Sequence, residues 1–111
     1  MNNIEFQSVL DAQIQRVRDI LEHKAEEYAS DVDRLANFKT AGGIKGESPK
    51  QALAGMMAKH TVSIYDMVLR TDRDYSTKVW DEKITDHINY LILLRALVEE
   101  DILPGLKEHS A

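Results

Sequence analysis

Apolar residues recur at steps of three and four over the first quarter of the chain. Between Ile4 and about Ser30 they stand at Val9, Leu10, Ile14, Val17, Ile20, Leu21, Ala25 and Tyr28. This spacing places the side chains on one stripe of an α-helix. We therefore expect a long amphipathic helix over residues 4–30.

The polar stretch that follows predicts a break and then a short helix. Residues 30–33 read Ser-Asp-Val-Asp, and side-chain oxygens of this kind compete with helical backbone hydrogen bonds or cap a helix start. We expect the short helix over residues 34–39, with Gly42-Gly43 as its end. Segment 42–48 leads to a helix N-terminus, which attracts phosphate, but it lacks the Walker pattern and is interpreted as a flexible connection.

Three residues mark the start of the next helix. Ser48 suits the N-cap, Pro49 the first helical position and Gln51 the return contact of a capping box, so a helix should run to about Arg70. This helix has two apolar faces and is expected to be central and the most buried. Its stripe contains Leu53, Met56, Met57, His60, Ile64, Met67 and Val68, and its second face contains Val62, Tyr65 and Leu69.

A last long helix follows the polar connection 71–74 and ends at Pro104-Gly105. Its apolar positions are Val79, Trp80, Ile84, Ile88, Leu91, Leu94 and Leu97. No segment alternates with period two, so the expected fold is an all-α bundle of three long helices plus one short helix. It forms a single domain over residues 1–111 with its core at about 4–103. Apolar residues on more than one face predict a homo-oligomer.

Composition and charge narrow the function classes. The 111 residues include no cysteine, which excludes disulfides and thiolate metal sites and favours an intracellular, cytoplasmic protein. The N-terminus lacks signal-peptide features, and the longest apolar run, residues 90–94, is too short for a membrane span. A net charge of −5 argues against electrostatic binding to nucleic acid.

Polar residues occupy positions where the stripes would otherwise be apolar. Lys24, His60 and Asp86 each fall on an inward line, with Glu82 one turn before Asp86 and Asn89 nearly one turn after it. They are either a buried polar network that fixes the packing or the lining of a polar pocket in the bundle. A serine nucleophile acting with His60 and Asp86 is disfavoured, because no strained elbow would expose it.

The pair Glu82 and Asp86 directs two carboxylates to one side of a helix, because residues four apart lie one above the other. Paired carboxylate oxygens suit a hard cation such as Mg²⁺. The same spacing is common on solvated helix faces, which is the simpler interpretation for Glu82 alone.

Four short runs together resemble a known pattern: residues 23–28 (His-Lys-Ala-Glu-Glu-Tyr), 33–39 (Asp-Arg-Leu-Ala-Asn-Phe-Lys), Lys59-His60 and 86–90 (Asp-His-Ile-Asn-Tyr). The pattern is similar to nucleotide-modification-associated domains of small phage and prophage proteins. More distantly it resembles MazG-like all-α NTP pyrophosphatases. The resemblance covers residues 22–98 and would place the protein in the cytoplasm of a phage host.

The resemblance implies a helical oligomer in which carboxylates hold Mg²⁺ against a nucleoside triphosphate and water releases pyrophosphate. By residue, Glu82 and Asp86 would bind the metal, with Asn89 beside them. Lys59 would contact phosphate, and His60 would contact phosphate or support the site. Sugar or base contacts would come from Tyr28, Asn37 and Phe38, and Lys24 would be an inward cation for the nucleotide.

One spacing differs from the MazG-like pattern. Those enzymes resemble Glu-x-x-Glu on one helix and Glu-x-x-Asp on another, whereas this chain has Glu82-x-x-x-Asp86 and no Glu-x-x-Glu in its first helix. One residue of spacing rotates a side chain by about 100° around a helix. The leading hypothesis is therefore a nucleotide-binding protein, with or without Mg²⁺-dependent pyrophosphohydrolase activity. The alternative is a non-enzymatic helical oligomer that acts as an interaction or structural module.

Overall fold

The computed structural model describes residues 1–27 and 33–102, and in α1 the side chains up to residue 23. Four helices occupy these residues, and no strand does: α1 (Asn3–Glu27), α2 (Ala36–Lys45), α3 (Pro49–Leu69) and α4 (Thr77–Ile102). The expected all-α fold with three long helices and one short helix is confirmed. None of the described helices combines the length and apolarity needed to cross a membrane.

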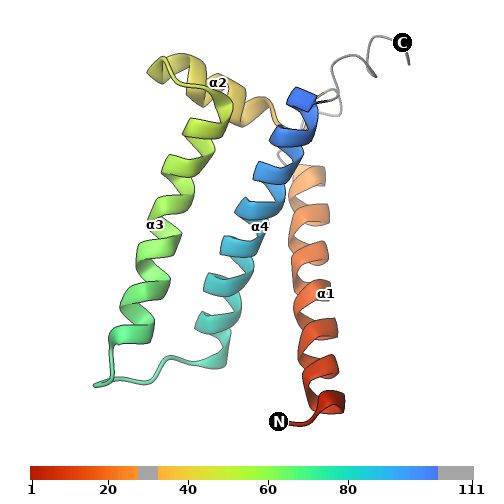
Figure 1. Ribbon diagram of the computed structural model, residues 1–111, viewed down its shortest axis with the longest axis vertical. Coiled ribbons are helices and arrows are strands. Elements are labelled where there is room, and N and C mark those ends of the chain that lie inside the picture. Colours follow the sequence, from red (N-terminus) through yellow and green to blue (C-terminus); the bar gives the residue numbers. More distant parts are fainter. Residues whose placement is uncertain (28–32, 103–111) are drawn as a thin grey trace.

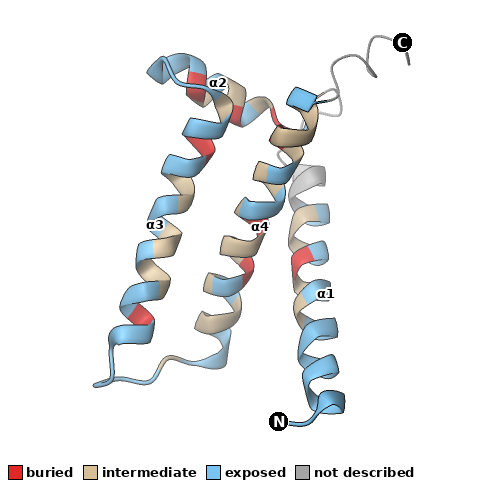
Figure 2. Cartoon of the chain, in the orientation of Figure 1, coloured by how far each residue is buried: buried red, intermediate tan, exposed pale blue. Residues whose placement is uncertain are grey.

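Helix α4 is the central element of the fold. Figure 1 shows it between α3 and α1, and each of these two helices packs against it. The expectation that the helix starting at Ser48 is central is wrong. The second apolar face of α3, which contains Val62, Tyr65 and Leu69, is exposed and not covered by another described helix (Figure 2). The described helices therefore form an open layer with α4 in the middle.

The hydrophobic core lies among α2, α3, α4 and the residues before α2. It is built on Leu35, Phe38, Leu53 and Leu97, with Met56, Met57, Tyr90, Leu93 and Leu94 packed around them. Among the described side chains of α1, only Val17 is buried, at 8% exposure. A hydrogen bond from Gln13 Nε2 to Thr85 Oγ1, 2.9 Å long, joins α1 to the buried side of α4.

The junction between α2 and α3 confirms one expectation and corrects another. The capping box is present, with Gln51 N donating to Ser48 Oγ at 3.1 Å and Ser48 N donating to Gln51 Oε1 at 2.9 Å. Gly42-Gly43 does not end the short helix, because α2 continues through both glycines to Lys45. The helix ends at Gly46, whose φ of 68° is the left-handed conformation that glycine adopts without steric cost.

Lys39 fixes the end of α4 to α2 and the segment before it. Its ammonium lies 2.6 Å from Asp33 Oδ2 and 2.5 Å from Glu100 Oε1. Hydrogen bonds to Asp33 and then Glu100 raise the pKa of Lys39 above its ordinary value of 10.5. This contact helps to hold together the end of the molecule where the core lies.

Candidate functional site

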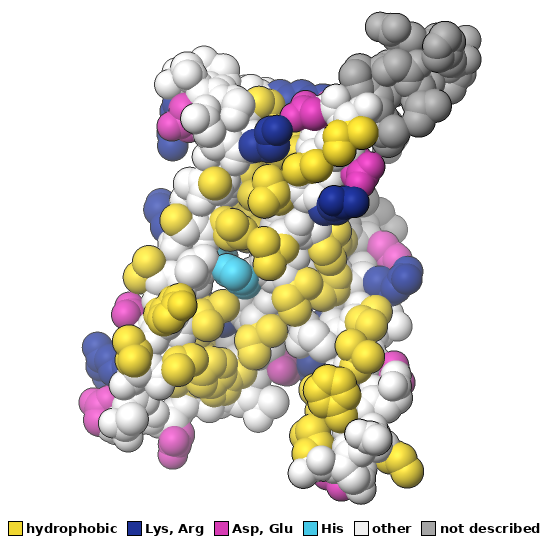
Figure 3. Space-filling view, viewed as in Figure 1, with side chains coloured by type: hydrophobic (Ala, Val, Ile, Leu, Met, Phe, Trp, Pro, Cys, Tyr) yellow, Lys and Arg dark blue, Asp and Glu magenta, His cyan; other side chains and the backbone are white. Residues whose placement is uncertain are grey.

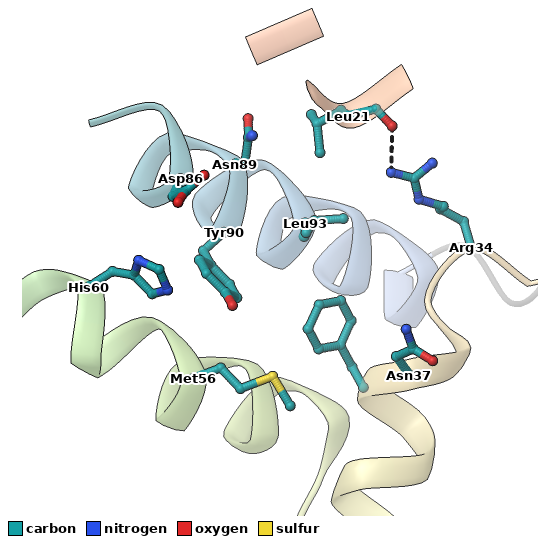
Figure 4. Close-up of a pocket in the computed structure, with 10 residues that line it drawn as sticks. Leu21, Arg34, Asn37, Met56, His60, Asp86, Asn89, Tyr90 and Leu93 are labelled. Carbon is teal, nitrogen blue, oxygen red and sulfur yellow. Dashed lines mark hydrogen bonds between the residues drawn. The ribbon is translucent and has the colours of Figure 1, made fainter. Parts of the chain in front are cut away.

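A cavity of about 390 Å³ lies between the four helices. Its lining comes from every helix and from the segment before α2 (Figure 4). The lining residues are Leu21 of α1, Arg34 before α2, Asn37 and Phe38 of α2, Met56 and His60 of α3, and Asp86, Asn89, Tyr90 and Leu93 of α4. The open layer thus has a concave site next to its core.

The α4 residues of the lining follow from helical register. Asp86, Asn89, Tyr90 and Leu93 are spaced by three, one and three residues, which places them on one face of the helix. In Figure 4, Asn89 projects toward α1, whereas Tyr90 points toward His60 on α3. Helix α4 therefore brings an acid, an amide and a phenol ring to one cavity.

Two of the lining residues contain buried polar atoms without a hydrogen-bond partner. Asn89 is 6% exposed, and both its Oδ1 and its Nδ2 are unpaired; so is Nδ1 of His60. A buried polar atom left unpaired costs about 1–3 kcal/mol, so such groups require an explanation such as a bound water, ion or ligand. No hydrogen bond among the described residues joins His60, Asp86 and Asn89 to one another.

The two histidines at the α3–α4 interface differ in this respect. The ring of His60 packs against Tyr90, with centroids 4.9 Å apart and planes tilted by 44°. His87 Nε2, in contrast, lies 2.7 Å from Thr61 Oγ1 and so has a hydrogen-bond partner. Only the histidine that lines the cavity has a buried nitrogen with no partner.

Opposite charges line the cavity as well. Asp86 is half-buried and forms no hydrogen bond or ion pair with a described residue. The exposed Arg34 donates one hydrogen bond, from Nη2 to the backbone oxygen of Leu21 at 2.8 Å. A guanidinium has five N–H groups, so Arg34 keeps donors for another group.

The structure brings together five of the nine residues that the sequence nominated: Asn37, Phe38, His60, Asp86 and Asn89. Lys59 is exposed on α3 and does not line the cavity. Tyr28 and the side chain of Lys24 lie outside the described residues.

The expectation that Glu82 faces the interior beside Asp86 is wrong. Glu82 is exposed and does not line the cavity, whereas Thr85, in the same turn of α4, is buried, so Glu82 lies on the solvent side of the helix. Within residues 1–23 and 33–102, no three or more His, Asp or Glu side chains are grouped so that they could hold a metal ion. Asp86 is the one acidic side chain in the described lining.

Sequence reasoning missed Arg34, Leu21, Met56 and Leu93 as lining residues. Met56 belongs to the apolar stripe of α3 and Leu21 to that of α1, and a stripe position does not reveal whether it borders a cavity or the core. Arg34 lies between helices, where no periodicity applies. In the sequence, this segment is marked only by the resemblance of residues 33–39 to the family pattern.

Comparisons with known proteins add no relative. No family model, curated protein or solved structure matches the chain. The resemblance to nucleotide-modification-associated and MazG-like domains therefore rests on its short sequence runs alone. The function has to be argued from the cavity itself.

Proposed function

We propose that the chain binds a nucleotide in the cavity between its helices. The observation that carries the proposal is the set of three buried, unpaired polar atoms, His60 Nδ1, Asn89 Oδ1 and Asn89 Nδ2. Concave sites with a few convergent polar groups on a mostly apolar lining are typical of small-molecule binding. The cavity volume of about 390 Å³ lies within the range of about 300–1,000 Å³ for such sites.

The Asn89 carboxamide suits a nucleobase because it offers one acceptor and two donor hydrogens. An amide pairs in a bidentate manner with a base edge that presents a neighbouring donor and acceptor. Tyr90 and His60 add aromatic surface beside it, and bases stack on aromatic side chains. A small adjustment of Asn89 would open its buried amide to the ligand.

Arg34 is the group in the cavity lining that suits the phosphates. Its remaining N–H donors match the geometry of phosphate oxygens, and hydrogen bonds to a charged acceptor are the stronger kind. Lys59 neighbours His60 in sequence but points outside the lining, so we propose it only for the distal end of a long phosphate chain. Lys24 remains a proposed phosphate contact on the strength of its register in α1.

We propose that a cation in the cavity would be held by Asp86 rather than by a pair of carboxylates. Asp86 supplies one carboxylate in the cavity and Glu82 stands apart from it. Mg²⁺ bound with phosphate takes one or two protein carboxylates. Asp86 is therefore the residue on which we propose that any metal dependence rests, and nucleotide binding does not require pyrophosphate release.

A thermal-shift titration with nucleosides and nucleoside mono-, di- and triphosphates, with and without Mg²⁺, tests the proposal. A ligand at about 100 times its Kd stabilises the folded chain by about 2.7 kcal/mol, which raises Tm by several degrees. His60→Phe keeps a ring against Tyr90, removes Nδ1 and should reduce this rise. His87→Phe is the matched control outside the cavity lining and should keep it.

Two further measurements test whether binding depends on a metal at Asp86 and whether the chain hydrolyses the nucleotide. Loss of the Mg²⁺-dependent part of the shift in Asp86→Asn would place the metal at this carboxylate, and pyrophosphate release would add hydrolysis. If no nucleotide raises Tm under either condition, the proposal is wrong. The non-enzymatic alternative would then account better for the chain.

A further inference from the structure

A second hollow, of about 480 Å³, runs along α1 and α4 and is mostly apolar. We call it the apolar groove; its apolar lining is Leu10, Ile14, Val17 and Leu21 of α1 with Ile88 and Ile92 of α4. Leu10, Ile14 and Ile92 remain 41%, 45% and 42% exposed. Figure 3 shows hydrophobic side chains at the surface along the length of α1.

The surface area of the chain indicates how much is left uncovered. A folded monomer of 12.6 kDa is expected to expose about 6,200 Å². The chain exposes 8343 Å², an excess of roughly 2,000 Å² that the apolar groove shares with other uncovered surfaces such as the second face of α3. Even half of that excess, about 1,000 Å², equals what one subunit buries in an obligate homodimer.

We infer that a second copy of this chain occupies the apolar groove, with the two α1 helices antiparallel about a two-fold axis. Leu10, Ile14, Val17 and Leu21 are separated by four, three and four residues, the heptad spacing of a helix–helix seam. In the antiparallel register, Leu10 meets the partner's Leu21, and Ile14 lies over the partner's Val17, which is 8% exposed and forms the floor of the groove. Every layer of this seam is apolar.

Charges beside the seam fit the same register. Asp11 and Arg18 are seven residues apart, so they lie on the same side of α1, and Arg18 lines the groove. In the antiparallel pair, Asp11 of each copy faces Arg18 of the other, which forms two symmetric ion pairs. In a parallel pair Arg18 would instead lie beside the uncharged Gln13 of the other copy and neither ion pair would form, so the charge pattern favours the antiparallel dimer.

A second copy fits this groove because the surface is complementary to itself. An isologous interface uses the same patch on both subunits, and the seam and both ion pairs meet that condition within α1 alone. Val17 already packs against α4, so α1 and α4 of the two copies would together make a four-helix bundle. This dimer does not depend on the proposed nucleotide binding.

Sedimentation velocity of the full chain over a range of concentrations tests the inference. The wild type is expected as a dimer. Asp11→Arg and Arg18→Asp each place like charges opposite one another at two contacts, which should weaken dimerisation about tenfold. The double variant restores opposite charges and should regain the wild-type dimer. Asp19→Arg is the matched control on the outer side of α1.

Ile14→Glu adds an independent test, because it puts a charge into the seam at a position that is already 45% exposed in the single chain. It should give a folded monomer by circular dichroism. A wild-type chain that sediments as a monomer at high concentration would overturn the inference. So would a dimer that tolerates Ile14→Glu, or a double variant that dimerises no better than the single charge reversals.

Discussion

Gly42 and Gly43 are neighbours in α2, but only Gly42 is closely packed against another part of the chain. A Cβ added to Gly42 would lie 2.7 Å from the backbone oxygen of Glu47 and 3.0 Å from that of Ser48. A Cβ added to Gly43 would meet nothing within 4 Å. Gly42 therefore allows the chain to pass close to α2 as it turns into α3, whereas Gly43 has no such role.

This contrast predicts opposite effects of the same substitution. Gly42→Ala should destabilise the chain by about 1–3 kcal/mol, because backbone atoms at a helix junction cannot move aside cheaply. Gly43→Ala should stabilise it by about 0.5–1 kcal/mol, because glycine in a helix costs conformational entropy. Urea unfolding of both variants checks the pair, and equal effects would contradict the close packing at Gly42.

The unpaired buried amide of Asn89 should lower the stability of the free chain and take part in the proposed nucleotide binding. Asn89→Leu replaces the buried unpaired amide with an apolar group of the same branched shape, and should raise the free energy of unfolding by about 1 kcal/mol without ligand. The same variant should lose the nucleotide-induced rise in Tm. Urea unfolding and the thermal-shift titration measure the two effects separately. A destabilised variant would indicate that the amide has a partner, such as a buried water.

Helical register explains which site residues could be predicted from the sequence. His60, Asp86 and Asn89 stood out because polar side chains interrupted apolar stripes. Arg34 could not be found in this way, since it lies before the first turn of α2. The exposure of Glu82 depends on how far the neighbouring helices cover α4, which the sequence of α4 alone does not specify.

Of the four described helices, α3 has the clearest capping sequence at its start. Ser48→Ala removes the side-chain acceptor for Gln51 N and should cost about 1 kcal/mol. Ser48→Asp keeps an acceptor at the N-cap and should retain most of the wild-type stability. Chemical denaturation compares the two variants. Equal losses would show that the cap contributes little beyond the packing of α3.

The contact of Lys39 with Asp33 and Glu100 predicts a pH dependence. Because the pKa of Lys39 is raised in the folded chain, its contribution to stability is fully present below its ordinary pKa of 10.5. The contribution is lost as the pH rises through the higher folded value. The stability difference between wild type and Lys39→Met should therefore be constant near neutral pH and shrink above 10.5. Denaturation across that range measures it.

The types and approximate positions of α1, α3 and α4 were predictable because each is long enough to display its own apolar period, and α3 also has a clear cap. The short helix α2 has no side-chain cap at Leu35 and was predicted from the polar break before it. The end of α2 was misplaced because glycines inside a helix and a glycine after it look alike in sequence; the positive φ occurs at Gly46 alone. The central position of α4 was also missed. Periodicity identifies an apolar face of a helix but not the neighbour or solvent that it meets.

At the scale of the whole molecule, α1 is attached on one side only. The core cluster contains residues of α2, α3, α4 and the segment before α2, while the main packing partner of α1 is α4. Amide hydrogen exchange should therefore be faster in α1 than in α3 and α4, because an element with few buried contacts opens locally. Protection of α1 should rise with protein concentration if the second copy covers it.

Leu21 lines both the cavity proposed to bind a nucleotide and the apolar groove. Its backbone oxygen also accepts the hydrogen bond from Arg34, the proposed phosphate contact. A second copy in the groove would thus contact a side chain that also lines the cavity. Dimerisation and nucleotide binding would then both involve Leu21. Such sharing is a route to thermodynamic coupling, which is reciprocal: if dimerisation tightens nucleotide binding, the nucleotide strengthens the dimer by the same factor. The concentration of the chain would then affect its apparent ligand affinity.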